Sequence, residues 1–284
     1  AGSMTAAELI GRAVARLRAL PGIDPYLEAR VLLRRAGGFT DFEIFAFPGR
    51  PVAAAAARRF LRAVEDRRGR VPLAYILGEK EFWSIPFTVS PAVLIPRPET
   101  ELIVERALEL VQAPDPLIID IGTGSGCLAV ALAKEIPGAR VVATDISRRA
   151  LRVAEANAAL HGAGNIRFAA GDLFGALRGL GLEGRADLIV SNPPYVTEEE
   201  WKRLAPEVRA HEPRRALVPG PTGLETIRRL ARGGPRFLKR GGVLLVEFGA
   251  GQAGAVRDLF GPPWTRSETA RDLSGCPRVA AAVL

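Results

Sequence analysis

The chain of 284 residues is predicted to be an α/β protein with a mostly parallel sheet, preceded by a small all-α bundle. Two observations support this fold class. From residue 117 to residue 248, short apolar segments alternate with amphipathic segments of helical period, whereas residues 4–78 show the helical period alone. Apolar strands that alternate with helices are typical of a parallel sheet covered on both faces.

The N-terminal region carries the start and stop signals of several helices. Capping boxes, an Asp-Pro start and a Gly-Gly stop are found at Thr5-x-x-Glu8, Thr40-x-x-Glu43, Asp24-Pro25 and Gly37-Gly38. The alanine-rich segment 52–68 places Phe60 and Val64 on one helical face. We therefore expect a helical domain over residues 4–78, with substrate recognition as its function.

Residues 79–100 are predicted to form a linker made of a hairpin and a proline-rich loop. Apolar and other residues alternate from Trp83 to Val89, which indicates a strand or hairpin, and Pro86 would place it at a sheet edge. The loop from Pro91 to Pro98 follows. A helix over residues 101–112 then begins the third part of the chain, a domain over residues 101–284.

Strands and helices alternate through this last domain. The predicted strands cover residues 117–121, 140–146, 166–170, 187–191 and 242–248. The predicted helices cover residues 125–136, 147–161 and 222–238. Residues 265–270 and 278–284 are expected to form a closing hairpin.

Composition excludes several classes of protein. Hydrophobic residues make up 48% and charged residues 25%, as in ordinary globular domains. The longest apolar runs are far shorter than the roughly 18 residues of a membrane span, and no secretory leader is recognised, so we expect a cytoplasmic protein without a membrane partner. Cys127 and Cys276 are too few for a disulfide framework, and no metal site is expected. Ala1-Gly2-Ser3 resembles a cloning remnant.

The charge balance is the one compositional hint about a partner. The net charge is +8 and the pI about 10.3, which is typical of nucleic-acid binders. Residues 1–85 carry +5 of this charge and the remaining 199 residues only +3. The likeliest basic cluster is Arg58, Arg59, Arg62, Arg67, Arg68 and Arg70. It is interpreted either as a solvated surface or as a docking face for a protein partner.

A glycine-rich loop, Asp120-Ile-Gly122-Thr-Gly124-Ser-Gly126, lies where a strand turns into a helix. A Walker loop would need Lys and then Ser or Thr after its last glycine, and a dinucleotide fingerprint would need glycine at position 127. Neither is present. An acid followed by G-x-G-x-G instead resembles the loop of S-adenosylmethionine-dependent methyltransferases.

Two further acids follow the next strands. Asp145 is placed to accept both hydroxyls of a ribose. In the methyltransferases that the loop resembles, the acid of Gly171-Asp172-Leu173 accepts from the adenine amino group and the next residue packs on or bonds the ring. The cofactor is thus expected to be S-adenosylmethionine. Its predicted binding residues are Asp120, Gly122, Thr123, Gly124, Ser125, Gly126, Asp145, Asp172, Leu173 and Asn192.

Asn192-Pro193-Pro194-Tyr195 follows another strand and is predicted to be the catalytic and substrate-binding motif. A planar amide or aromatic-amine nitrogen is a poor nucleophile because its lone pair is delocalised. The Asn192 side-chain oxygen and the Pro193 carbonyl can accept its two N–H groups, which aims the lone pair at a methyl donor and stabilises positive charge on nitrogen. Tyr195 can pack on the planar group. The motif indicates the type of atom that is methylated rather than the substrate.

Further motifs make a resemblance specific: Pro72-Leu-Ala-Tyr-Ile-Leu-Gly78, Glu81-Phe-Trp83, Leu94-Ile-Pro-Arg-Pro-Glu-Thr100, His211-Glu-Pro213, Gly223-Leu224 and Glu247-Phe-Gly-x-Gly-Gln252. From about residue 70 to the end, the chain resembles the protein-(glutamine-N5) methyltransferases of class I translation release factors. The resemblance implies a Rossmann-like class I fold with a mostly parallel seven-stranded sheet and a C-terminal antiparallel hairpin. It also implies methylation of the glutamine side-chain amide in the factor's Gly-Gly-Gln loop.

The alternative function is a nucleic-acid amino-methyltransferase acting on adenine N6 or cytosine N4, which shares the Asn-Pro-Pro-Tyr logic. No separate base-recognition domain is evident, so we expect a release factor as partner, no direct binding of nucleic acid, and a monomer. His211 is given no role. Glu247 is expected to make a structural bond to backbone rather than to take part in catalysis.

Overall fold

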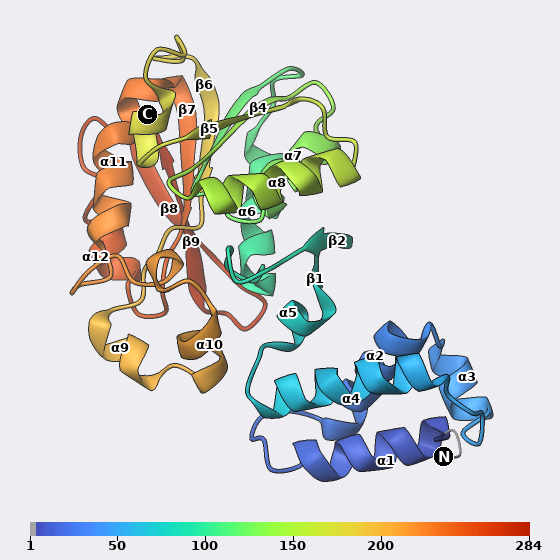
Figure 1. Ribbon diagram of the computed structural model, residues 1–284. Helices are drawn as coiled ribbons and strands as arrows, with labels where there is room; N and C mark the ends of the chain where they lie inside the picture. Colours follow the sequence, from blue (N-terminus) through green and yellow to red (C-terminus); the bar gives the residue numbers. More distant parts are fainter. Residues whose placement is uncertain (1–3) are drawn as a thin grey trace. The chain divides into compact units, whose positions relative to one another are not determined.

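The computed structural model describes residues 4–284, so Ala1–Ser3, expected to be a cloning remnant, lie outside the described residues. The chain divides into two compact units, which are coloured along the sequence in Figure 1. One comprises the residues up to Gly78 together with Pro206–His211, and the other comprises Glu79–Ala205 and Glu212–Leu284. The short segment 206–211 was not expected to belong with the N-terminal helices.

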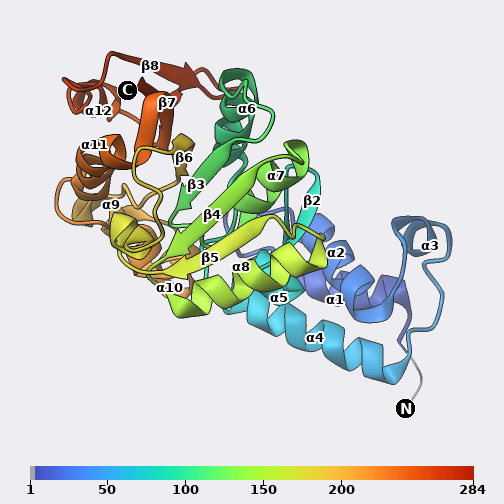
Figure 2. The ribbon, with the colours of Figure 1, turned by 90° about the horizontal axis from the view of Figure 1, so that it is seen from above.

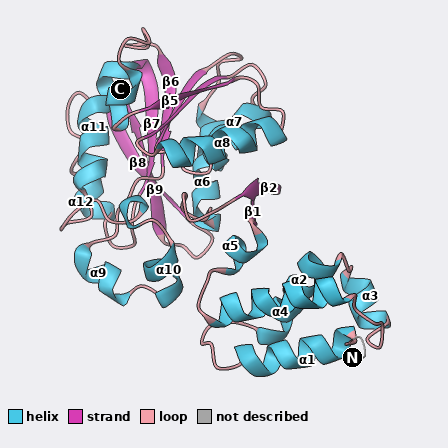
Figure 3. Ribbon diagram, in the orientation of Figure 1, coloured by secondary structure: helices cyan, strands magenta, loops and turns pink. Residues whose placement is uncertain are grey.

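The first unit is built from helices (Figure 3). They are α1 (Ala6–Leu17), α2 (Pro25–Gly37), α3 (Asp41–Ala46), α4 (Ala54–Arg68), α5 (Leu73–Leu77) and α10 (Pro206–His211). Both predicted capping boxes are present, and the Asp24 side chain accepts from the backbone N–H groups of Tyr26 and Leu27. The predicted apolar face of α4 is also confirmed, since Phe60 and Val64 are fully buried against α1 and α2.

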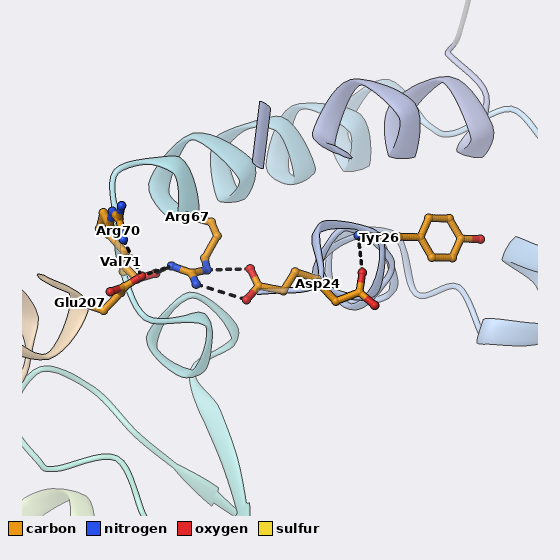
Figure 4. A network of polar contacts seen from close by, with 7 residues as sticks. Asp24, Tyr26, Arg67, Arg70, Val71 and Glu207 are labelled. Atoms are coloured by element: carbon orange, nitrogen blue, oxygen red, sulfur yellow. Dashed lines mark hydrogen bonds and ion pairs between the residues drawn. The ribbon is translucent and has the colours of Figure 1, made fainter. Parts of the chain in front are cut away.

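A buried arginine explains why α10 belongs to this unit (Figure 4). Arg67 is only 4% exposed and donates twice to the Glu28 carboxylate, at 2.7 and 3.2 Å. It also donates to the Val71 carbonyl and to Glu207 of α10, both at 3.4 Å. Arg70 donates to the same Glu207 oxygen at 3.4 Å. Removing one partner from a buried, hydrogen-bonded ion pair is strongly destabilising, so these contacts hold the segment in place.

The predicted basic cluster is correspondingly smaller than expected. Arg67 and Arg70 are used inside the unit, and the Arg59 guanidinium donates twice to the Ala36 carbonyl at the end of α2. Arg68 pairs with Glu65 on its own helix. Within the described residues, Arg58 and Arg62 are the exposed members of the cluster for which neither an ion pair nor a hydrogen bond of the side chain is found.

The second unit begins with a tight hairpin of β1 (Glu79–Phe82) and β2 (Ile85–Thr88). Its turn residues Trp83 and Ser84 have φ of +52° and +55°, the left-handed pair of a type I′ turn. The expected strand starting at Trp83 is therefore wrong in that detail, because Trp83 is a turn residue. The Asn157 side chain bonds both the N–H and the carbonyl of Thr88 and so fixes the hairpin on the helix α8 (Arg148–Leu160).

A seven-stranded sheet has the order β5-β4-β3-β6-β7-β9-β8. Its strands are β3 (Leu117–Ile121), β4 (Arg140–Asp145), β5 (Ile166–Ala170), β6 (Ala186–Ser191), β7 (Leu238–Glu247), β8 (Arg266–Arg271) and β9 (Pro277–Val283). Neighbours from β5 to β7 are parallel, whereas β9 runs antiparallel to both β7 and β8. The predicted strands, their parallel pairing and the closing hairpin are confirmed.

Helices cover both faces of this sheet (Figure 2). They are α6 (Glu101–Leu110), α7 (Cys127–Glu135), α8 (Arg148–Leu160), α11 (Glu225–Phe237) and α12 (Ala253–Arg257). The same unit also contains the short helix α9 (Glu198–Arg203), which has no buried residue. Successive strand residues alternate between the two faces: Ile118 packs with α6 and α7, and Ile119 packs with α11 and α12. Cys127 is buried on the same face of the sheet as Ile118. Among the described residues, no helix is long and apolar enough to cross a bilayer.

Candidate active site

The candidate site lies where the direction of strand order reverses. β3 pairs with β4 on one side and with β6 on the other, and β6 comes about 70 residues later in the chain. Open α/β sheets bind ligands at the carboxyl ends of strands at such a switch point. A cavity of about 590 Å³ is found there, the size of a small-molecule site. Its lining includes Gly122, Gly124, Asp145, Asp172, Asn192 and Pro193.

The predicted glycine loop adopts the backbone conformation that its composition indicates. Gly122, Gly124 and Gly126 have φ of +78°, +57° and +83°. Gly126 also lies against α8, because a Cβ there would be 3.0 Å from the Ala154 methyl group. The loop therefore needs glycine both for its turn and for the close approach of α7 to α8.

Asp120, at the start of this motif, is fully buried at the end of β3. Its Oδ2 accepts from the Thr123 hydroxyl at 2.5 Å, whereas its Oδ1 has no hydrogen-bond partner within the described residues. Burial raises the pKa of the Asp120 carboxyl to about 7. A buried carboxylate oxygen without a donor is costly. Asp120 directly precedes Ile121 and Gly122, which line the cavity, but it is not itself among the lining residues.

Asp145 follows β4 and is partly buried in the pocket wall. One carboxylate oxygen accepts the Gly124 N–H at 3.0 Å and the other accepts the Ser147 N–H at 2.8 Å. Burial raises the pKa of this carboxyl, against the effect of these bonds and of the Arg215 charge. Asp145 thus holds the glycine loop in shape and keeps lone pairs free for a ligand.

Asp172 and Leu173 follow β5 on the same edge of the sheet and also line the pocket. Asp172 is exposed and pairs with Arg229 of α11 at 2.7 Å, a contact that was not expected. Leu173 has φ of +46°, a left-handed conformation that is uncommon for a residue with a side chain. Such local strain is typical of ligand sites.

The Asn192–Tyr195 segment leaves β6 directly beside the glycine loop. The Asn192 side-chain nitrogen donates to the Thr100 hydroxyl at 2.8 Å. Within the part of the chain that the structure describes, neither the Asn192 side-chain oxygen nor the Pro193 carbonyl has a partner. Asn192, Pro193 and Pro194 line the pocket, but Tyr195 is not among the lining residues. The two predicted acceptors are therefore both available at the cavity.

Tyr195 instead contacts a buried carboxylate. Its hydroxyl donates to Glu247 Oε1 at 3.0 Å, and the Thr100 hydroxyl donates to Glu247 Oε2 at 2.6 Å. Burial raises the pKa of Glu247 to about 7 and also raises the pKa of Tyr195. The expected backbone bond of Glu247 is wrong, because both of its oxygens accept from side-chain hydroxyls.

Sequence reasoning missed several residues that hold the Asn192–Tyr195 segment in place. Gln252 donates to the Tyr195 carbonyl at 3.0 Å and accepts the Gly249 N–H at 2.8 Å. Gly223, with φ of +75°, passes so close that a Cβ would be 2.4 Å from the Tyr195 carbonyl oxygen. Both residues lie in motifs that carried the family resemblance, Gly223-Leu224 and Glu247-Phe-Gly-x-Gly-Gln252, but neither residue had been given a role.

Glu212 is another such residue. Its buried carboxylate accepts the Ile95 N–H at 3.1 Å and pairs with Arg97 at 2.5 Å, and so it joins the His211-Glu-Pro213 motif to the proline-rich loop. His211 itself ends α10 in the helical unit. No group of His, Cys, Asp and Glu within residues 4–284 is arranged to hold a metal ion.

Comparisons with known proteins agree with this geometry. Residues 100–222 match the family described as "Methyltransferase small domain", and residues 8–78 match the family described as "PrmC N-terminal domain". A methyltransferase from Pyrococcus furiosus has the same fold, with a TM-score of 0.54 at 16% identity over 77% of this chain and 98% of that one. Fold and site together define the chain as a methyltransferase.

Two curated relatives are more similar in sequence. A release factor glutamine methyltransferase from Chlorobaculum tepidum is 42% identical over 90% of this chain and 89% of that protein. One from Cereibacter sphaeroides is 42% identical over 99% of both chains. The chain belongs to the family of release factor glutamine methyltransferases. Membership favours a protein substrate over the alternative of a nucleic-acid base.

Proposed function

We propose that this enzyme transfers a methyl group from S-adenosylmethionine to the side-chain amide nitrogen of the glutamine in the Gly-Gly-Gln loop of a class I release factor. The observation that carries the proposal is the pair of free acceptors, the Asn192 side-chain oxygen and the Pro193 carbonyl, at the edge of the pocket. Two acceptors match the two N–H groups of a primary amide.

These acceptors supply orientation and charge stabilisation. With both N–H groups held, the plane of the substrate amide is fixed, so that the face of its nitrogen can be aimed at a methyl donor. The proposed cofactor would supply a methyl group that this nitrogen could accept, with the electron pair of the broken C–S bond remaining on sulfur. The positive charge that grows on nitrogen is stabilised by the two oxygens. The product amide then loses one proton to water, so no strong base is required.

The residues present fit the proposed cofactor, which supplies an activated methyl group on a sulfonium. The free Oδ1 of Asp120 is a suitable acceptor for its ammonium group, directly or through water. Asp145 keeps unused lone pairs that are proposed to accept from ribose hydroxyls, and Asp172 and Leu173, which line the cavity, are proposed to hold the adenine. Gly122, Thr123, Gly124, Ser125 and Gly126 are proposed to contact the methionine end.

The helical unit is proposed to dock the release factor. Around α3 it exposes large apolar side chains: Tyr26, Leu27, Phe42, Phe45 and Phe47. Phe45 is 84% exposed, and the Phe42 and Phe47 rings stack edge to face at 6.2 Å. Apolar groups of this size are typical of protein-binding surfaces. Arg58 and Arg62 add positive charge to the same unit.

The direct test is methyl transfer to purified release factor. We expect labelled methyl from S-adenosylmethionine to enter the factor and to be absent when its Gly-Gly-Gln glutamine is replaced by alanine. Equal labelling of the alanine factor would refute the proposal. DNA and RNA are the matched substrates for the alternative function, and preferential labelling of either would support that alternative. A cytoplasmic monomer is the simplest form consistent with this activity.

A further inference from the structure

We propose that Thr100 and Glu247 are positioning residues that set which way the Asn192 amide faces, so that its oxygen and not its nitrogen meets the substrate amide. This inference rests on the proposed function, because it concerns the same nitrogen acceptor. Thr100 comes from the start of α6, Glu247 from the end of β7, and Asn192 from the end of β6. Neither Thr100 nor Glu247 lies in the motif that identifies the reaction.

The direction of each hydrogen bond follows from which groups carry protons. An ionised Glu247 can only accept, so the Thr100 hydroxyl gives its single proton to Oε2 at 2.6 Å. The Thr100 oxygen then has only lone pairs to offer to Asn192, 2.8 Å away. The amide nitrogen must therefore face Thr100, and the amide oxygen must face the other way.

Burial favours this orientation of the Asn192 amide over the reversed one. Thr100 is 2% exposed and Glu247 is 1% exposed, so water is not a substitute partner. A reversed Asn192 would bring two oxygen lone pairs together, and buried groups left without a partner are costly. Thr100 precedes α6 but makes no capping bond with its side chain, so its hydroxyl is available for the bonds to Glu247 and Asn192.

The same carboxylate also holds the other end of the motif, because Tyr195 donates to Glu247 Oε1 at 3.0 Å. One buried charge thus organises both Asn192 and Tyr195. If Glu247 takes up a proton, it can donate to Thr100, and the freed hydroxyl proton of Thr100 can then bond the Asn192 oxygen. Protonation of Glu247 therefore permits the reversed, non-productive amide.

This protonation falls in an accessible range of pH. Burial raises the pKa of Glu247 to about 7, aided by the charge of Glu99, and opposed by its bonds to Thr100 and Tyr195 and by the charge of Arg278. The charge of Glu247 in turn raises the pKa of the Tyr195 hydroxyl and of the buried Cys127 thiol. We expect turnover to fall as the pH is lowered through about 7.

The test compares full-length variants in the release-factor assay. Thr100→Val removes the hydroxyl at nearly constant volume and is expected to lower kcat at least about tenfold. The KM for the factor and the affinity for S-adenosylhomocysteine should stay within about twofold. Thr100→Ser keeps the hydroxyl and should retain kcat within about threefold. Val104→Ala, a buried position on the same helix, controls for lost stability and should leave kcat unchanged.

Glu247→Gln supplies a readout that a purely structural role would not change. Its kcat should be lower than that of the wild type, and it should no longer fall as the pH is lowered from 8 to 6. The inference is overturned if Thr100→Val turns over like the wild type, if Thr100→Ser fails as badly as Thr100→Val, or if Glu247→Gln keeps the decline. A wild-type enzyme that leaves the factor unmethylated would refute the proposed function and this inference with it. An active wild type with an unaffected Thr100→Val would refute the inference alone.

Discussion

Replacing Asn192 by alanine tests the central step of the proposed reaction. The change removes the free Oδ1 acceptor but leaves the Pro193 carbonyl in place, so one of two groups that stabilise charge on nitrogen is lost. Removing one such group from a preorganised site typically lowers kcat by about 10²–10³. This corresponds to roughly 3–4 kcal/mol of transition-state stabilisation.

The effect on folding should be much smaller. The variant loses one hydrogen bond, from Asn192 to Thr100 at 2.8 Å, while Thr100 still donates to Glu247. A lost bond of this kind costs about 1 kcal/mol, or a Tm decrease of about 2–4 °C for a chain of this length. The glycine loop and Asp145 are untouched, so affinity for S-adenosylhomocysteine should be nearly unchanged.

Three measurements separate these effects: kcat for methyl transfer to the factor, calorimetric affinity for S-adenosylhomocysteine, and Tm. Asn165→Ala is the matched control, because its side chain bonds the Ala133 and Ala139 carbonyls just before β5, at the opposite end of the strands from the site. It should lose similar stability and keep its turnover. Turnover of Asn192→Ala within about threefold of wild type would refute the assigned role, and so would a parallel loss of cofactor affinity.

Three other changes have expected outcomes. Gly223→Ala places a Cβ 2.4 Å from the Tyr195 carbonyl at φ +75°, so kcat should fall at least about tenfold; unchanged turnover would contradict the tight approach. Burial raises the pKa of Asp120 to about 7, so the folded protein keeps a proton that the unfolded chain releases near pH 4. The free energy of unfolding should therefore fall as the pH rises from 5 to 8. Asp120→Asn should flatten that decline and stabilise the ligand-free protein at pH 8 by on the order of 2 kcal/mol, while it weakens cofactor binding. An unchanged pH dependence of urea unfolding would refute this. Phe45→Ser should raise the KM for the factor several-fold, whereas Leu273→Ser, at a still more exposed position, should not; equal effects would argue against docking.

The sequence by itself determined the local elements and most of the site's components. Helix starts were predictable because a capping box satisfies backbone donors within four residues, as Thr5 and Thr40 do. Buried parallel strands were predictable because they are short and apolar throughout. The glycine loop and the Asn192 motif could be found because each is contiguous, and residues that follow parallel strands must share one edge of the sheet.

Tertiary structure decided which distant side chains meet. The hairpin turn at Trp83 and the short helices α5, α9, α10 and α12 have too few residues to show a period. The contacts of Glu247 with Thr100 and Tyr195 span 147 and 52 residues, and the contact of Arg67 with Glu207 spans 140. Hydrogen bonds of this range depend on strand order and helix packing, which no local pattern encodes. The sequence therefore identified Asn192 as the amide proposed to face the substrate, and only the fold brought that amide to Thr100 and Glu247.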